Sequence, residues 1–362
     1  MWREIPHTLA HAPARLLKRW RWQSVAKCPG WKPVLSFGGV LESGRLVHGG
    51  AVKLLTLRDS FDCHETNCNL LYMVSSAQPA FASDLAGIFG KKGIPLVWNQ
   101  NGVGYPAWAG RDTERHNAPM RQLLSAATHV VYQSEFCRSS ADKFLGHRAQ
   151  SSSVLLNPVD LLQFRPPDAV LAFQPLRLLS IGTQNYRERA IASIDCLAQL
   201  RNRGHECSLT IAGPLLWKGA AEDIISRAEA VDVAGCLDLK PPFHREEAAD
   251  IYRAHHVLLH PKYLDPCPTV VAEALSCGLP VVASRSGGIP EMTDGDCAEL
   301  IDVPIVWDRL ITPGGPQMAD AVERILARYA CATRAARARA EILFDSARWV
   351  EKHREIFSTV LH

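Results

Sequence analysis

The chain lacks several patterns that would assign it to a specialised class of protein. None of its apolar runs approaches the roughly 20 residues that a membrane-spanning helix needs, and its first residues lack the apolar core of a signal peptide. Its eleven cysteines include no C-x-x-C pair and no zinc-finger spacing, which disfavours a disulfide framework or a structural zinc site. We therefore expect reduced thiols and a cytoplasmic location.

The charge balance gives no general case for nucleic-acid binding, because 40 basic residues stand against 37 acidic ones. The exception is local. Residues 1–32 form a basic aromatic segment, in which the first 27 residues carry six basic side chains, one acidic side chain, and the tryptophans Trp2, Trp20 and Trp22. This composition suits peripheral contact with an anionic membrane, which would place the protein at the inner face of that membrane. A solvated leader, or a helix laid across the domain, is the alternative.

The length of 362 residues and the 47% hydrophobic content fit two globular domains. Apolar runs alternate with amphipathic segments on both sides of a Pro-containing stretch near residues 160–175, which predicts an α/β protein with two Rossmann-like domains that face each other. The predicted domains are an N-terminal domain at 33–165, a C-terminal domain at 166–345 and a closing helix at 346–362.

The stretch 255–292 carries the strongest functional signal. Its predicted order is a buried strand at 257–259, a polar loop, a helix at 269–276, a second strand at 280–283 and a Gly-rich loop at 284–291. Ligands of parallel α/β sheets bind at the carboxyl ends of the strands, where this polar loop and this Gly-rich loop lie.

The residues of this stretch suit a nucleotide-linked sugar. The uncapped amides at the start of the predicted helix favour an anion such as a diphosphate. Asp265 before that helix and Glu273 within it can accept hydrogen bonds from hydroxyl groups. Gly287 and Gly288 have no Cβ atom, so a ligand could approach their backbone closely.

The spacing of these residues resembles a known family. An acidic residue, seven residues, Glu273, then G-x-P-V-V-A and G-G-x-P-E are similar to the donor-site signature of retaining GT-B glycosyltransferases of family four (glycosyl transferases group 1). The usual first acid is Glu, and Asp265 is one methylene shorter. The run N-x-V-D at 157–160, followed by F-x-P, resembles the family's exit from its first domain.

The resemblance implies a GT-B fold whose C-terminal helix crosses back to the N-terminal domain. It implies transfer of a sugar, with retention, from a UDP- or GDP-linked donor to a saccharide or lipid-linked saccharide acceptor in polysaccharide or glycoconjugate biosynthesis. No metal and no cofactor are expected. The implied catalytic residues are Asp265, which would bind the donor sugar, and Arg187 and Arg189, either of which could hold the diphosphate. The implied donor-binding residues, with Glu273 on the ribose, are Glu273, Lys262, Thr269, Val270, Gly182, Gly287, Gly288 and Gly50.

A loop at 99–108 follows a predicted strand at 94–98 and is dense in amides, glycines and aromatic residues. Amide side chains can both donate hydrogen bonds to sugar hydroxyls and accept hydrogen bonds from them, and aromatic faces stack on pyranose rings. We expect an acceptor-side loop with Asn99, Asn101, Tyr105 and Trp108 as its contacts. Ordinary Asn and Gly turn chemistry is the alternative. Many relatives project a histidine into this region, and the sequence shows no clear counterpart.

Two other functions remain open at this point. A sugar-nucleotide epimerase shares the two-domain design, but it would need an acid–base pair beside the sugar. A non-catalytic nucleotide-sugar-binding component of a polysaccharide assembly complex would need no catalytic group at all. The nucleotide, sugar and acceptor, the linkage formed and the oligomeric state do not follow from the sequence.

Overall fold

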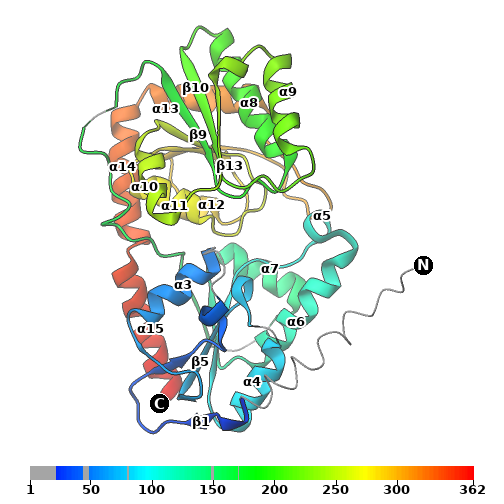
Figure 1. The fold of residues 1–362 in the computed structure, drawn as a ribbon, viewed down its shortest axis with the longest axis vertical. Helices are drawn as coiled ribbons and strands as arrows, with labels where there is room; N and C mark the ends of the chain where they lie inside the picture. Colours follow the sequence, from blue (N-terminus) through cyan, green and yellow to red (C-terminus); the bar gives the residue numbers. More distant parts are fainter. Residues whose placement is uncertain (1–21, 44–48, 80, 148–150, 170) are drawn as a thin grey trace.

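The computed structural model describes residues 22–43, 49–79, 81–147, 151–169 and 171–362. These residues form two α/β domains, which lie one above the other in Figure 1, and each domain contains a six-stranded parallel sheet. The predicted architecture of two facing Rossmann-like domains is therefore confirmed. The chain passes from one sheet to the other between Val154 and Leu176.

The N-terminal domain has the strand order β3-β2-β5-β6-β7-β8. The bounds are β2 Val34–Ser36, β3 Asp62–Cys63, β5 Leu70–Val74, β6 Leu96–Gln100, β7 His129–Tyr132 and β8 Ser151–Val154, with β1 Ala26–Lys27 and β4 Asn67–Cys68 in a separate two-stranded sheet. The helices are α3 Gly49–Arg58, α4 Ala82–Lys91, α5 Pro106–Ala109, α6 Thr113–Ala126 and α7 Glu135–Leu145. Both β5 and β6 are buried along their whole length, as expected for strands covered by helices on both faces.

The C-terminal domain has the strand order β11-β10-β9-β12-β13-β14. The strands are β9 Leu176–Ile181, β10 Cys207–Ala212, β11 Leu237–Lys240, β12 Val257–His260, β13 Val281–Ser284 and β14 Ala298–Ile301. The helices are α8 Arg187–Asn202, α9 Ala220–Ala230, α10 Arg245–Arg253, α11 Thr269–Ser276, α12 Ile289–Met292, α13 Gly315–Leu326 and α14 Tyr329–Leu343. The order of the sheet reverses between β9 and β12, and such a switch point is where doubly wound sheets bind their ligands.

The last helix, α15 (Ser346–Leu361), lies against the N-terminal domain, as predicted (Figure 1). Its buried side chains Trp349, Ile356 and Phe357 belong to the same apolar cluster as residues of β2, α3 and β5. The Tyr72 hydroxyl of β5 lies 2.9 Å from Nε2 of His353 on this helix. The chain therefore ends in the core of the domain in which it began.

The predicted membrane segment is mostly outside the described residues, Trp2 and Trp20 included. Trp22 is described, and it is buried 5.9 Å from the ring of Phe89 on α4. This side chain therefore stabilises the N-terminal domain and does not face a membrane surface. In the part of the chain that the structure describes, no helix is long and apolar enough to cross a membrane.

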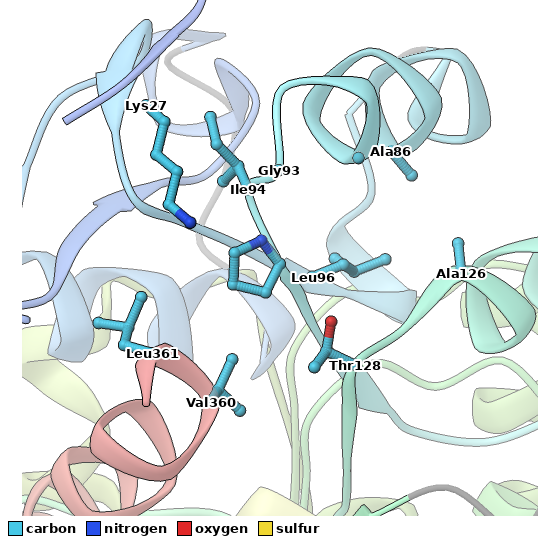
Figure 2. Close-up of a pocket in the computed structure, with 11 residues that line it drawn as sticks. Lys27, Ala86, Gly93, Ile94, Leu96, Ala126, Thr128, Val360 and Leu361 are labelled. Atoms are coloured by element: carbon cyan, nitrogen blue, oxygen red, sulfur yellow. The ribbon is translucent and has the colours of Figure 1, made fainter. Parts of the chain in front are cut away.

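A pocket of about 330 Å³ lies beside α4 and the last turn of α15 (Figure 2). Pro95, Leu96 and Thr128 line it just before or at the amino ends of β6 and β7, and Lys27 is its one charged lining residue. Apart from Lys27 and Thr128, the described residues that line it are glycines and residues with apolar side chains. Because ligands of such sheets bind at the carboxyl ends of the strands, this pocket is at the wrong edge for the candidate site.

Candidate active site at the domain boundary

Asp265 is the centre of a buried charged cluster in the loop after β12. Its Oδ2 atom lies 3.0 Å from the Lys262 ammonium and accepts a hydrogen bond of 3.1 Å from Nε2 of His260. Burial acts to raise the pKa of Asp265, but Lys262 and His260 outweigh it and hold that pKa well below its ordinary value. Burial lowers the pKa of His260 to about 4, so its imidazole is neutral at pH 7. The loop therefore holds an ionised carboxylate beside one ammonium group.

The two candidate arginines after β9 have different surroundings. Arg187, the first residue of α8, is exposed and pairs with Asp223 of α9 at 2.9 Å. Arg189 is buried, and its guanidinium donates to the carbonyl oxygen of Ile181 at 2.9 Å and lies 3.4 Å from Nδ1 of His260. Burial lowers the pKa of Arg189 to about 10, which leaves it charged at pH 7. Only Arg189 is therefore linked, through His260, to Asp265.

Glu273 lies one turn into α11, whose bounds match the predicted helix. Its Oε2 atom accepts a hydrogen bond of 2.8 Å from the hydroxyl of Tyr252 on α10. Burial raises the pKa of Glu273 to about 7, more than the Tyr252 hydroxyl lowers it. Glu273 therefore titrates near neutral pH, in contrast to Asp265, which is ionised there.

The N-termini of α3 and α11 lie side by side at the boundary between the domains. A Cβ atom built on Gly49 would lie 3.2 Å from Oγ1 of Thr269. Neither helix has an acidic residue in its first turn, and α11 begins after Pro268 with no side-chain cap. The uncapped start of α11 therefore lies beside the start of α3 from the other domain, with no neutralising carboxylate in either first turn, which favours an anion.

Four of the predicted donor-binding residues, namely Thr269, Val270, Gly182 and Gly50, lie around these helix starts. A Cβ atom on Gly182 would lie 3.1 Å from Val270, and one on Gly50 would overlap Ser76. Since Glu273 follows Thr269 by four residues and Val270 by three, it lies on the same face of α11. The structure therefore brings the ribose candidate, Glu273, and the helix-start amides to one side of α11.

Gly287 and Gly288 lie against the Asp265 loop. A Cβ atom on Gly287 would overlap the carbonyl of Asp265, and one on Gly288 would overlap the carbonyl of Pro266. The Gly288 amide donates to the Asp265 carbonyl at 2.9 Å. These glycines allow two loops of the same domain to pack backbone to backbone, which is a sufficient reason for glycine at both positions.

The strand β6 runs to Gln100, so Asn99 lies in that strand and not in the predicted loop. Asn99 and Asn101, two of the predicted sugar contacts, both turn inward. Oδ1 atoms of Asn99 and Asn101 each accept a hydrogen bond of 2.9 Å from the Lys53 ammonium, and Oε1 of Gln133 accepts a third at 3.0 Å. An ammonium has three protons, so these bonds use all of them. Burial lowers the pKa of Lys53 to about 8, and the described residues provide no carboxylate that pairs with it.

The aromatic residues of that loop differ from one another. Tyr105 is buried at the boundary, where burial and then the neighbouring Tyr186 and Asp265 raise its pKa well above the ordinary value. Trp108 on α5 is 47% exposed and lies 4.9 Å from the ring of His116. Tyr105 therefore lies near the donor carboxylate, whereas Trp108 remains available to a ligand from solvent.

Sequence reasoning missed Lys53 and His260. Lys53 could have been found, because it is the only charged residue between Gly49 and Leu57 in an otherwise largely apolar helix. His260 ends a buried strand two residues before Lys262, which is a weaker signal. The D-x-D at 294–296 forms a turn, in which the Asp294 carboxylate accepts hydrogen bonds from the amides of Asp296 and Cys297.

The chain is similar in sequence to known proteins. Residues 175–328 match the family model described as glycosyl transferases group 1. The chain is 27% identical over 203 residues to the D-inositol 3-phosphate glycosyltransferase of Mycobacterium sp. (strain KMS), a match that spans 52% of this chain and 44% of that protein. It is 25% identical over 193 residues to the putative colanic acid biosynthesis glycosyltransferase WcaL of Escherichia coli (strain K12), across 52% and 47% of the two chains. The chain thus covers less than half the length of these relatives.

The fold matches that of a solved structure over most of the chain. The crystal structure of Anabaena HepE in complex with UDP superposes with a TM-score of 0.68 and 16% sequence identity, over 86% of this chain and 90% of that one. The chain therefore has the GT-B arrangement of two parallel-sheet domains.

Proposed function

We propose that the protein transfers a sugar, with retention at the anomeric carbon, from a nucleotide-sugar donor to an acceptor hydroxyl in polysaccharide or glycoconjugate biosynthesis. One observation carries this proposal. An ionised Asp265 and the ribose candidate Glu273 flank the uncapped start of α11, which lies beside the start of α3 in the other domain. The family match across 175–328, which contains all of these C-terminal residues, supports it.

The donor's diphosphate is placed at the paired helix starts. The amides of α11 and α3 point positive partial charges at the oxygen that becomes the leaving group, and Lys262 adds a full charge near Asp265. Donors that are fixed before the reaction stabilise the charge that develops in the transition state without reorganisation. This set of groups requires no resident metal ion in the proposed mechanism.

Glu273 binds the ribose hydroxyls, and Asp265 binds the hydroxyls of the donor sugar. Asp265 is suited to this because its pKa is low and because His260 and Lys262 fix its orientation. The acceptor hydroxyl attacks from the face that the diphosphate leaves, so no protein nucleophile is assigned. The donor is UDP- or GDP-linked in this proposal, and HepE, with the same fold, has been solved with UDP and with UDP-glucose.

A donor screen tests the proposal. A nucleotide-sugar that binds only the folded protein raises its melting temperature, so panels of UDP-, GDP- and ADP-sugars should reveal one class of donor. The selected donor is then incubated with carbohydrate and lipid-linked acceptors, and we expect sugar transfer. Conversion of the donor with no acceptor present would identify an epimerase instead. Binding without transfer to any acceptor would identify the non-catalytic binding component.

A further inference from the structure

A segment without helix or strand, residues 302–314, connects β14 to α13 and contacts the N-terminal domain; we call it the strap. The carbonyl of Trp307 in the strap accepts a hydrogen bond of 2.8 Å from the amide of Ala107 on α5. Figure 1 shows α5 at the level of the boundary between the two domains. The strap therefore belongs to one domain by sequence and holds a residue of the other.

The indole of Trp307 lies in an aromatic socket of the N-terminal domain. It stacks on Phe136 at a centroid distance of 5.7 Å and meets the edges of Phe144 at 5.0 Å and of Tyr105 at 5.2 Å. The ammonium of Lys143 lies 5.4 Å from its ring centroid. Four side chains from one domain thus surround a single side chain from the other, in the tilted and stacked arrangements that aromatic and cationic groups prefer.

The strap is also bound to the loop that carries Asp265. The Tyr263 hydroxyl accepts a hydrogen bond of 2.7 Å from the Val306 amide and lies 2.7 Å from the Pro304 carbonyl, to which it can donate. Tyr263 precedes Asp265 by two residues. The strap residues just before Trp307 are therefore bonded to the loop that carries Asp265, and Trp307 itself packs against Tyr105.

These contacts close a ring of interactions around the proposed sugar end of the site. Tyr105 belongs to the same buried apolar cluster as Tyr263 and Leu264, the two residues just before Asp265. Tyr105 packs on Trp307, and the strap that carries Trp307 is bonded to Tyr263 beside Asp265. If the indole left its socket, Tyr105 would lose its packing partner and the two domains would lose their aromatic contact.

We propose that Trp307 is a positioning residue: packing of its half-buried indole against Tyr105, Phe136 and Phe144 holds the domains together and fixes Tyr105 against Tyr263 and Leu264 of the loop that carries Asp265. The indole touches no reacting atom, and it acts through Tyr105 and through the strap. The expected effect of Trp307 on kcat rests on the proposed function, whereas its expected effect on the domain arrangement does not.

Two measurements on Trp307→Ala test the proposal. Small-angle X-ray scattering without any ligand should show a larger radius of gyration than the unchanged protein, because the domains separate more freely. With the donor chosen by the melting screen, the donor dissociation constant should stay within about threefold while kcat falls about tenfold or more, since misplacement of a reacting partner costs rate rather than donor affinity. Trp307→Phe, which keeps an aromatic ring, should recover part of both losses.

Trp31→Ala is the matched control, because Trp31 is 61% exposed and, among the described residues, stacks on His362 alone, at 4.3 Å. It should change neither scattering nor kcat. Tyr263→Phe keeps the ring but removes the strap bonds, so it should lower kcat in the same direction and serves if Trp307→Ala fails to fold. Unchanged scattering together with unchanged kcat in Trp307→Ala would overturn the inference. A protein that binds no nucleotide-sugar but expands in Trp307→Ala would refute the proposed function and leave the domain-holding role intact.

Discussion

The two loops that meet at the domain boundary use their polar side chains in opposite ways. The C-terminal loop around Asp265 concentrates charge, with an ionised carboxylate, a lysine and a neutral histidine in direct contact. In the N-terminal segment around Asn99 and Asn101, the amide oxygens accept hydrogen bonds from Lys53, a cation of the same domain. The charged groups of the first loop suit ligand binding, whereas the amides of the second stabilise the N-terminal domain next to the boundary.

The difference shows what residue type can and cannot predict. Two carboxylates at a fixed spacing before and within a helix have few structural uses. The functional interpretation of Asp265 and Glu273 was therefore specific. Asn and Gln serve equally well as ligand contacts and as internal partners, because each carries both donors and an acceptor. A buried lysine with no acid in reach requires oxygen partners, and the amide loop supplies them.

Removal of the carboxylate from the C-terminal loop should have the largest effect. Asp265→Ala leaves Lys262 and His260 without their shared acceptor, so we expect a loss of about 3 kcal/mol in the free energy of unfolding and no detectable sugar transfer. Urea denaturation and a transfer assay measure the two effects. Glu355→Ala, which breaks an exposed pair with Lys352, is the control and should cost under about 1 kcal/mol. If both variants lost the same free energy of unfolding, the buried Asp265 cluster would contribute no more to stability than an exposed ion pair.

Lys53→Met tests the N-terminal loop, and its stability effect should depend on pH. The folded-state pKa of Lys53 is about 8, below the ordinary 10.5 of an unfolded chain. Between these values the unfolded chain binds more protons, so the unfolding free energy of the unchanged protein should rise with pH by up to about 3 kcal/mol relative to Lys53→Met. The penalty on the charged form is fully present below pH 8. If the unfolding free energies of the unchanged protein and of Lys53→Met changed in parallel from pH 7 to pH 10, Lys53 would not be buried as a cation.

At pH 7 the same Lys53→Met variant leaves three amide oxygens without their donor, so we expect it to be less stable than the unchanged protein by about 2 kcal/mol. Lys92→Met, at an exposed position after α4, should change stability by less than about 0.5 kcal/mol. Urea denaturation of the two variants at one pH gives this comparison.

Arg187→Ala should have the smallest effect. Its exposed pair with Asp223 contributes no more than about 1 kcal/mol to stability, and Arg187 has no connection to the Asp265 cluster. We expect the donor dissociation constant to change by less than about threefold, a difference under about 1 kcal/mol. Calorimetric titration of the donor measures it. A tenfold weakening would show that Arg187 leaves Asp223 to bind the diphosphate, and that the donor site extends to the start of α8.

Much of the fold followed from the sequence, because strand, helix and turn patterns alternate strongly in both halves. The helix at 269–276 and the returning C-terminal helix lie where they were predicted. What the sequence could not show were contacts between distant residues, such as Trp307 with Phe136 or Glu291 with the amides of α7. Such contacts depend on how two finished domains meet, and no local pattern encodes that.

The candidate site was predictable where a single segment carried it. Asp265, Glu273 and the two glycines lie within 24 positions of one another, and the structure keeps them together. The two arginines were indistinguishable in sequence, since both lie just after β9. The structure distinguishes them by burial: Arg189 is buried, whereas Arg187 is exposed and pairs with Asp223. Which of the two is buried depends on how helix α8 packs.

The most direct test of the account is the pH dependence of donor binding. The free protein holds Glu273 with a pKa of about 7, and the ribose hydroxyls need its ionised form as an acceptor. Donor affinity measured by calorimetry should therefore rise by about fivefold to tenfold from pH 6 to pH 8 in the unchanged protein, since protonation withdraws the binding-competent form below the pKa. In Glu273→Gln it should be weaker and independent of pH. Equal affinities of the two proteins at both pH values would contradict the assignment of Glu273 to the nucleotide and, with it, the proposed donor site.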